Sequence, residues 1–235
     1  MMKEKIKHIF FDLDNTLWDT DKNSKTTLET MFSEMKVTEK YGLDFSDFYP
    51  NYYVRNEKLW DLYRQNLATK QDIISKRFCS TFQEFDINDE ELNQYFEENF
   101  LKKVVENNDL VENAENALRY LKSNNYNLHI VSNGFIEPTE RKVFDTPIHQ
   151  YVSTVTSGEE INKRKPAREV FELGLQKARA LPEESSFVGD DWSADALGSE
   201  KIGMFPVFFD YKKEKKYKQN GFPIVEDLLE LKNIF

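Results

Sequence analysis

The sequence has 235 residues, of which 39% are hydrophobic, which is enough for one large domain, or one domain with a modest insertion, to bury a substantial core. Its 42 acidic and 32 basic residues give a net charge of -10, so the chain as a whole is repelled by nucleic-acid backbones and anionic membranes. We therefore expect neither a nucleic-acid partner nor a membrane partner.

The single cysteine, Cys79, excludes a disulfide within this sequence and indicates a reducing compartment. It lies in a run with helical spacing, residues 73–82, with no histidine nearby in sequence, which favours a structural thiol over a nucleophile. No apolar stretch approaches the roughly 18 residues of a membrane span, and residues 1–7 contain no signal-peptide core. Together these features predict a cytoplasmic protein.

The first predicted strand covers residues 6–11, a short apolar run that ends at Asp12. After it, apolar residues recur only at helical spacing for a stretch that is too long to be a loop of a compact domain. We expect an inserted all-helical domain at residues 20–107, with linkers near residues 20–25 and 106–109.

The rest of the chain alternates between helical and strand patterns. The predicted elements are a helix at 114–121, strands at 128–131 and 152–155, a helix at 168–180, strands at 187–188 and 204–209, and a terminal helix near 225–231. This alternation predicts an α/β core, residues 1–19 and 108–235, with a parallel sheet and helices on both faces. In such sheets the ligand lies beyond the carboxyl ends of the strands, so polar residues directly after strands are site candidates.

Two carboxylates, Asp12 and Asp14, follow the first predicted strand. Residues two apart on an extended strand project to the same side, and like charges placed together repel unless a cation lies between them. A pair of this kind is weak evidence by itself, because glycosyltransferases and many metal sites use one. The alternative interpretation is a pair of solvated or capping aspartates.

Further polar candidates follow later strands. Ser132 and Asn133 come after one strand and can hold an anion through a hydroxyl and turn amides, although Ser-Asn-Gly is also an ordinary turn. Lys165 can neutralise charge on a transferring phosphoryl group, although one lysine among three adjacent cations is usually solvated. Asp190, with Asp195 downstream, can complete the oxygen ligands of Mg²⁺. The combination is what phosphoryl transfer through a carboxylate intermediate requires.

Four segments resemble the motifs of the haloacid dehalogenase superfamily, in that superfamily's order: FFDLDNTLWDT, IVSNGF, RKPAREVF and FVGDDWSADALGSEKIGM. The resemblance extends over nearly the whole chain. It implies a Rossmann-like core with an inserted helical cap, a Mg²⁺ cofactor, and hydrolysis of small-molecule phosphomonoesters through an aspartyl-phosphate. Among members of the superfamily, the chain is most similar to phosphatases that act on pyrimidine nucleoside 5'-monophosphates.

The resemblance implies a role for each matching residue. Asp12 attacks phosphorus, while Asp14 protonates the leaving oxygen and later activates water. Ser132, Asn133 and Lys165 bind the phosphoryl group, and Ser132 and Lys165 also count among the catalytic residues.

The implied metal ligands are the side chains of Asp12 and Asp190, together with the main-chain carbonyl of Asp14. Asp195 is expected to support the metal indirectly. Asp191 stands where the superfamily often has serine, and its carboxylate either alters metal affinity or faces solvent, of which we favour the second.

A second departure lies after Lys165, where the usual Pro-Asp-Pro is replaced by a sequence containing Ala167 and Arg168. We expect altered loop geometry there with the chemistry of Lys165 kept.

Several alternatives remain open at this point. Within the superfamily, a sugar phosphomutase is the second candidate, whereas true dehalogenases do not keep an aspartate at the position of Asp14. Outside enzymes, the alternatives are a non-catalytic phosphate-binding protein and a signalling module such as a receiver domain. The aromatic residues of the cap form either a nucleobase platform or, as we favour, the cap's own core: Phe45, Phe48, Tyr49, Tyr52, Tyr53 and Trp60. The expected partner is a small phosphorylated metabolite, and the protein is expected to be a monomer or homodimer.

Overall fold

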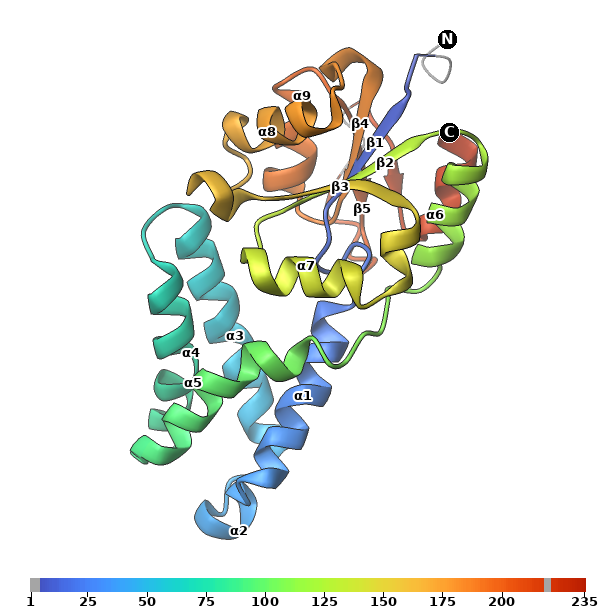
Figure 1. Ribbon diagram of the computed structural model, residues 1–235. Coiled ribbons are helices and arrows are strands. Elements are labelled where there is room, and N and C mark those ends of the chain that lie inside the picture. The colour runs from blue at the N-terminus through green and yellow to red at the C-terminus, as the bar shows by residue number, and fades with distance from the viewer. Residues whose placement is uncertain (1–4, 218–220) are drawn as a thin grey trace. The chain divides into compact units, whose positions relative to one another are not determined.

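The computed structural model describes residues 5–217 and 221–235. The chain forms two compact units, which we call the core unit, Met1–Thr20 with Asn108–Phe235, and the helical unit, Asp21–Asn107. Each unit is described by itself below (Figure 1).

The core unit contains a six-stranded parallel sheet with the strand order β3-β2-β1-β4-β5-β6. Its strands are β1 (His8–Phe11), β2 (Asn127–Ser132), β3 (Val152–Ser157), β4 (Ser185–Gly189), β5 (Phe205–Phe209) and β6 (Ile224–Val225). The chain adds β2 and β3 on one side of β1 and then β4, β5 and β6 on the other side. The direction of winding therefore reverses between β1 and β4, which is where ligands bind in sheets of this kind.

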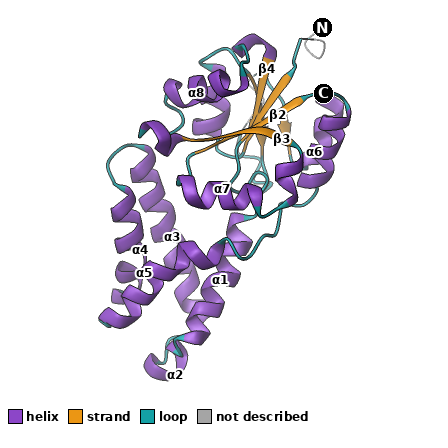
Figure 2. Ribbon diagram, in the orientation of Figure 1, coloured by secondary structure: helices purple, strands orange, loops and turns teal. Residues whose placement is uncertain are grey.

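Helices cover both faces of this sheet (Figure 2). They are α6 (Ala114–Ser123), α7 (Ile136–Phe144), α8 (Arg168–Ala178), α9 (Leu197–Glu200) and α10 (Leu231–Ile234). The buried face of α8 carries Val170 and Phe171, which join Phe10 of β1 in one apolar cluster. Gly174 allows the close approach, because a Cβ there would lie 2.7 Å from the side chain of Val131. The predicted fold class, a parallel α/β sheet between helices, is confirmed.

Three local predictions differ from the structure. Residues 20–25, expected as a linker, are the first turns of α1 (Thr20–Glu34). The expected terminal helix near 225–231 is replaced by β6, a short 3-10 turn and α10, because a strand of two residues is too short to show periodicity. Helix α7 was not predicted; Pro138 lies in its first turn, where a missing N–H is tolerated.

The helical unit has its own aromatic core. Its helices are α1, α2 (Val37–Tyr41), α3 (Phe45–Arg64), α4 (Lys70–Gln83) and α5 (Glu90–Val104). Phe48 stacks on Phe82 with ring centres 4.9 Å apart, and Tyr52 stacks on Phe78 at 5.3 Å. Phe48 and Tyr52 therefore pack the interior of their own unit, as we favoured. Among the described residues, no helix is long and apolar enough to cross a membrane.

Two histidines lie side by side near the amino ends of β1 and β2. His8 Nδ1 is 3.1 Å from His129 Nε2, and the other ring nitrogen of His129 is 2.9 Å from the hydroxyl of Thr154. Burial, reinforced by the neighbouring His8, lowers the pKa of His129 from 6.5 to about 4. The folded chain thus favours the neutral imidazole at this position.

The free energy of unfolding is expected to fall as the pH drops from 7 to 5. A histidine whose pKa is lowered by folding takes up its proton more readily in the unfolded chain, so its stabilising contribution is lost below its usual pKa. For the shift of His129 from 6.5 to about 4, the loss is about 2 kcal/mol. Urea unfolding at both pH values should show a shallower pH dependence for His129→Gln than for wild type. Equal slopes in wild type and His129→Gln would contradict this assignment.

Candidate active site

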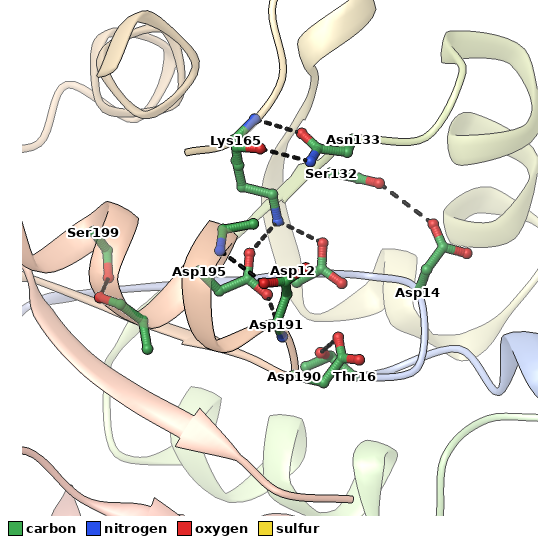
Figure 3. A network of polar contacts seen from close by, with 12 residues as sticks. Asp12, Asp14, Thr16, Ser132, Asn133, Lys165, Asp190, Asp191, Asp195 and Ser199 are labelled. Atoms are coloured by element: carbon green, nitrogen blue, oxygen red, sulfur yellow. Dashed lines mark hydrogen bonds and ion pairs between the residues drawn. The ribbon is translucent and has the colours of Figure 1, made fainter. Parts of the chain in front are cut away.

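The carboxyl ends of three neighbouring strands and one loop bring the predicted polar residues together (Figure 3). Asp12 follows β1, Asp190 follows β4, and Ser132 is the last residue of β2. Lys165 enters from the loop that precedes α8. This edge lies at the reversal of the sheet, because β1 and β4 are adjacent strands there.

Lys165 is the centre of a buried ionic network. Its Nζ donates to Asp12 Oδ1 at 2.6 Å and to Asp195 Oδ1 at 2.7 Å, and its side chain is only 2% exposed. The second oxygen of Asp195 accepts from the main-chain N–H of Asp191 at 3.1 Å. Gly189 makes this close packing possible, because a Cβ there would lie 2.2 Å from Asp195 Oδ2. Asp195 therefore fixes both the lysine and the backbone after β4.

The residues present fit a divalent cation with oxygen ligands. Oxygens of Asp12, Asp190 and Asp195 all lie within 4.8 Å of one another, and Lys165 supplies one positive charge against three carboxylates. Desolvation, with the repulsion of neighbouring carboxylates, raises the pKa of Asp12 to about 7 despite the adjacent lysine, and raises that of Asp190 well above its usual value. A bound cation would relieve this repulsion, and Mg²⁺ prefers such carboxylate ligands.

The side chain of Asp14 has partners other than the carboxylate cluster. Its Oδ1 accepts hydrogen bonds from the ammonium of Lys142 and, at 2.7 Å, from the hydroxyl of Thr20. Its Oδ2 accepts from the hydroxyl of Ser132 at 3.5 Å. Desolvation opposes ionisation of this carboxyl, but Lys142 and the other donors outweigh it and lower its pKa. The side chains of Asp14 and Asp12 thus have different partners, although a single residue separates them in sequence.

Asn133 and Asp191 each make contacts that the sequence did not indicate. The Asn133 side chain accepts from the main-chain N–H of Lys165 at 2.7 Å and donates to its carbonyl at 3.1 Å, which positions the lysine. Asp191 neither joins the acidic cluster nor simply faces solvent. Its Oδ1 accepts from the main-chain N–H groups of Ser193 and Ala194 at 2.9 and 2.8 Å, so it caps the turn Trp192–Ala196.

The departure after Lys165 leaves the lysine in the site. Ala167 precedes α8 and donates its N–H to the carbonyl of Arg164 at 2.8 Å, while Arg168 pairs with Glu172 on the exposed side of that helix. Neither residue draws Lys165 away from Asp12. The expected change in loop geometry stays a prediction.

Sequence reasoning missed Lys142, Thr20 and Thr16. Thr16 donates to Asp190 Oδ1 at 3.2 Å, and the other two bind Asp14. Neither Lys142 nor Thr20 directly follows a predicted strand, and Thr16, in the loop after the first one, has no charge to mark it. A lysine in an amphipathic segment usually faces solvent. Only the recognition of α7 as a helix starting after the Ser-Asn-Gly turn would have pointed to Lys142.

A family model and several characterised relatives match most of the chain, and all of them are hydrolases. A family model described as haloacid dehalogenase-like hydrolase matches residues 9–208. The chain is 29% identical over 198 residues to the pyrimidine 5'-nucleotidase YjjG of Escherichia coli, covering 83% of this chain and 82% of that protein. It is 24% identical over 205 residues to the pyrimidine 5'-nucleotidase PynA of Streptococcus pneumoniae, covering 86% and 83%. A glyceraldehyde 3-phosphate phosphatase of Methanothermobacter thermautotrophicus is 24% identical over 97% of this chain and 99% of its own.

Solved structures show the same fold. The magnesium-bound HAD-hydrolase YfnB from Bacillus subtilis superposes with a TM-score of 0.86 at 19% identity, covering 98% of both chains. A dehalogenase superposes with a TM-score of 0.73 at 17% identity, covering 99% of this chain and 98% of that chain. At such identities the likeness concerns the fold alone, since one fold supports different reactions.

Proposed function

The chain belongs to the haloacid dehalogenase-like hydrolase family, and we propose that it is a Mg²⁺-dependent phosphatase that forms an aspartyl-phosphate on Asp12. The observation that carries this proposal is the buried contact of Asp12 with Lys165, 2.6 Å long, beside two further carboxylates at the reversal of the sheet. A carboxylate nucleophile, an ammonium and a set of metal-binding oxygens are what phosphoryl transfer of this kind needs.

In the first step, one oxygen of Asp12 attacks phosphorus, and the bond between phosphorus and the ester oxygen breaks. The leaving oxygen takes a proton from the carboxyl group of Asp14. Lys165 and the hydroxyl of Ser132 bind the phosphoryl oxygens, whose charge they offset. The products of this step are a free alcohol and a phosphoryl group bonded to Asp12.

In the second step, Asp14 takes a proton from water as the water oxygen attacks phosphorus. The bond between phosphorus and Asp12 breaks, which releases inorganic phosphate and restores both carboxyl groups to their starting states. The lowered pKa of Asp14 favours the carboxylate form that this step needs, and a dianionic phosphoryl group beside it raises that pKa for the first step.

Asp12 and Asp190, with the main-chain carbonyl of Asp14, would hold the Mg²⁺ ion, and Asp195 would support them through Lys165 and the backbone of Asp191. When bound, the ion supplies positive charge that offsets the repulsion between the nucleophile and the phosphoryl oxygens.

We propose small phosphorylated metabolites as substrates, with pyrimidine nucleoside 5'-monophosphates first. Two relatives named as pyrimidine 5'-nucleotidases support this order, and a relative named as a glyceraldehyde 3-phosphate phosphatase makes sugar phosphates the next class. The single cysteine supports a reducing compartment such as the cytoplasm. Purified protein should hydrolyse p-nitrophenyl phosphate with Mg²⁺ and not with EDTA, and a panel of nucleotides and sugar phosphates then ranks the substrates. Absence of Mg²⁺-dependent phosphate release from every compound would refute the proposal.

Mg²⁺ is expected to raise the melting temperature of the protein, and Asp190→Asn should remove most of this shift. Binding to the folded chain alone stabilises it by about 2.7 kcal/mol at a concentration about 100 times the dissociation constant, which is several degrees for a chain of this size. Differential scanning fluorimetry with MgCl₂ against EDTA measures the effect. Asp145→Asn is the matched control, because Asp145 directly follows α7 and, among the described residues, its carboxylate pairs only with Arg141 of that helix. An unchanged shift in Asp190→Asn would exclude this residue as a ligand.

A further inference from the structure

We infer that Lys142 is a positioning residue of this site: it anchors Asp14 through Oδ1 and leaves Oδ2 as the oxygen that exchanges the proton. The inference rests on the proposed function, because it assigns atoms within that reaction. Nothing in the sequence motifs marks Lys142, which belongs to α7 and lies 128 residues from Asp14 along the chain.

The two oxygens of Asp14 have unequal partners. Oδ1 accepts from the ammonium of Lys142 and from the hydroxyl of Thr20, the latter at 2.7 Å. Among the described residues, Oδ2 has only a long contact, 3.5 Å, with the hydroxyl of Ser132 (Figure 3). An oxygen that already accepts from an ammonium and a hydroxyl is poorly placed to take a proton from water. The weakly bonded oxygen is therefore the one available for chemistry.

Oδ2 of Asp14 also lies beside Gly134, whose lack of a side chain leaves space next to this oxygen. A Cβ at Gly134 would stand 3.3 Å from Asp14 Oδ2, 3.1 Å from Ser132 Oγ and 2.7 Å from Thr139 Oγ1. The glycine keeps that side of Oδ2 clear beside two hydroxyl groups. The hydroxyl of Thr139 is buried and has no hydrogen-bond partner among the described residues, so it can bind an incoming polar atom.

Lys142 is itself fixed from a second direction. Its Nζ lies 4.2 Å from the centre of the Trp18 ring, and that ring is fully buried. Trp18 and Asp14 belong to one tight loop after β1, in which Asn15 donates its N–H to the carbonyl of Trp18 at 2.8 Å. The ammonium is thus held between a carboxylate and an aromatic face of the same loop, with its side chain 11% exposed.

The contacts of Lys142 restrict the rotation of the Asp14 side chain. Without Lys142, Oδ1 would keep only the Thr20 hydroxyl as a donor among the described residues, and the Asp14 carboxylate would populate other orientations. A misplaced acid slows reactions in which the leaving oxygen needs a proton, and it slows attack by water. It does not slow the departure of a leaving group that is stable as an anion.

Lys142→Met tests the inference through leaving-group dependence. With an alkyl phosphate such as a nucleoside monophosphate, kcat should fall about 10²-fold while KM stays within about threefold. With 2,4-dinitrophenyl phosphate, whose phenolate leaves without a proton, the pre-steady-state burst of phenolate should keep its wild-type rate, followed by slow turnover. Lys142→Arg should recover part of the alkyl phosphatase activity, since it keeps a cation beside Oδ1.

The matched control is Lys177→Met, because Lys177 also forms an ion pair within the core unit, with Glu160, outside the site. It should show wild-type kinetics with both substrates. If Lys142→Met does not fold, Thr20→Val removes the other hydrogen bond to Asp14 Oδ1. This variant should also lose alkyl phosphatase activity selectively, by a smaller factor. Equal loss of burst rate and alkyl phosphatase rate, or no loss of either, would overturn the inference while leaving the proposed function intact. Absence of Mg²⁺-dependent turnover in wild type would overturn both.

Discussion

Asp12→Asn is expected to lower phosphatase turnover by about 10⁴-fold or more, because an amide oxygen cannot serve as the nucleophile that accepts the phosphoryl group. Asp12 lies within hydrogen-bond distance of Lys165 and among the carboxylates of the proposed metal site, which is where the proposed phosphoryl group binds. Steady-state assays with p-nitrophenyl phosphate measure the loss, and rapid acid quenching should trap a phosphoenzyme in wild type and none in the variant.

The same substitution should raise the melting temperature in EDTA at pH 8. Burial and neighbouring carboxylates raise the pKa of Asp12 from 3.8 to about 7, so its ionisation above that pH destabilises the folded chain. Asparagine removes this charge. A variant that is more stable but inactive has therefore lost the nucleophile and not the fold. Asp145→Asn, at the exposed residue directly after α7, should change neither activity nor stability. Wild-type turnover in Asp12→Asn would refute the nucleophile assignment.

Lys165→Met is expected to destabilise the core unit by about 3–5 kcal/mol and to lower turnover by about 10³-fold. Lys165 is the shared partner of Asp12 and Asp195, and its side chain is 2% exposed, so its removal leaves buried carboxylates without their cation. The loss of activity follows separately, because the same ammonium is proposed to bind the phosphoryl oxygens. Urea unfolding in EDTA measures the first effect, and steady-state kinetics in saturating Mg²⁺ measures the second.

The control for Lys165→Met is again Lys177→Met. Lys177 is 31% exposed and pairs with Glu160 near the surface, where such pairs contribute about 0–1 kcal/mol. Mg²⁺ should recover part of the stability of Lys165→Met and none of its lost phosphoryl binding. A Lys165→Met variant as stable as Lys177→Met would contradict the central place of this lysine in the network.

Much of the site can be predicted from the positions of polar residues relative to apolar runs in the sequence. Each of Asp12, Ser132 and Asp190 lies at or directly after the end of a short apolar run, and parallel strands bring such ends to one edge. The order of the sheet could not be predicted in this way, because strand neighbours depend on contacts between distant segments. The two-residue strand β6 and helix α7 were missed for a simpler reason: the first is too short for periodicity, and the second begins in a segment that contains Pro138.

Hydrophobic periodicity and motif spacing are properties of neighbouring residues, and they suffice to identify the parallel α/β core, the helical insertion and the strand ends that carry Asp12 and Asp190. The hydrogen-bond partners of each polar side chain, by contrast, cannot be identified from neighbouring residues. That Asp14 binds Lys142, and that Asn133 positions Lys165, depends on packing between segments 128 and 32 residues apart along the chain. Charge and hydrogen-bond geometry act over a few ångströms in space, so only the tertiary structure decides which carboxylates lie together beside Lys165 and which one binds Lys142.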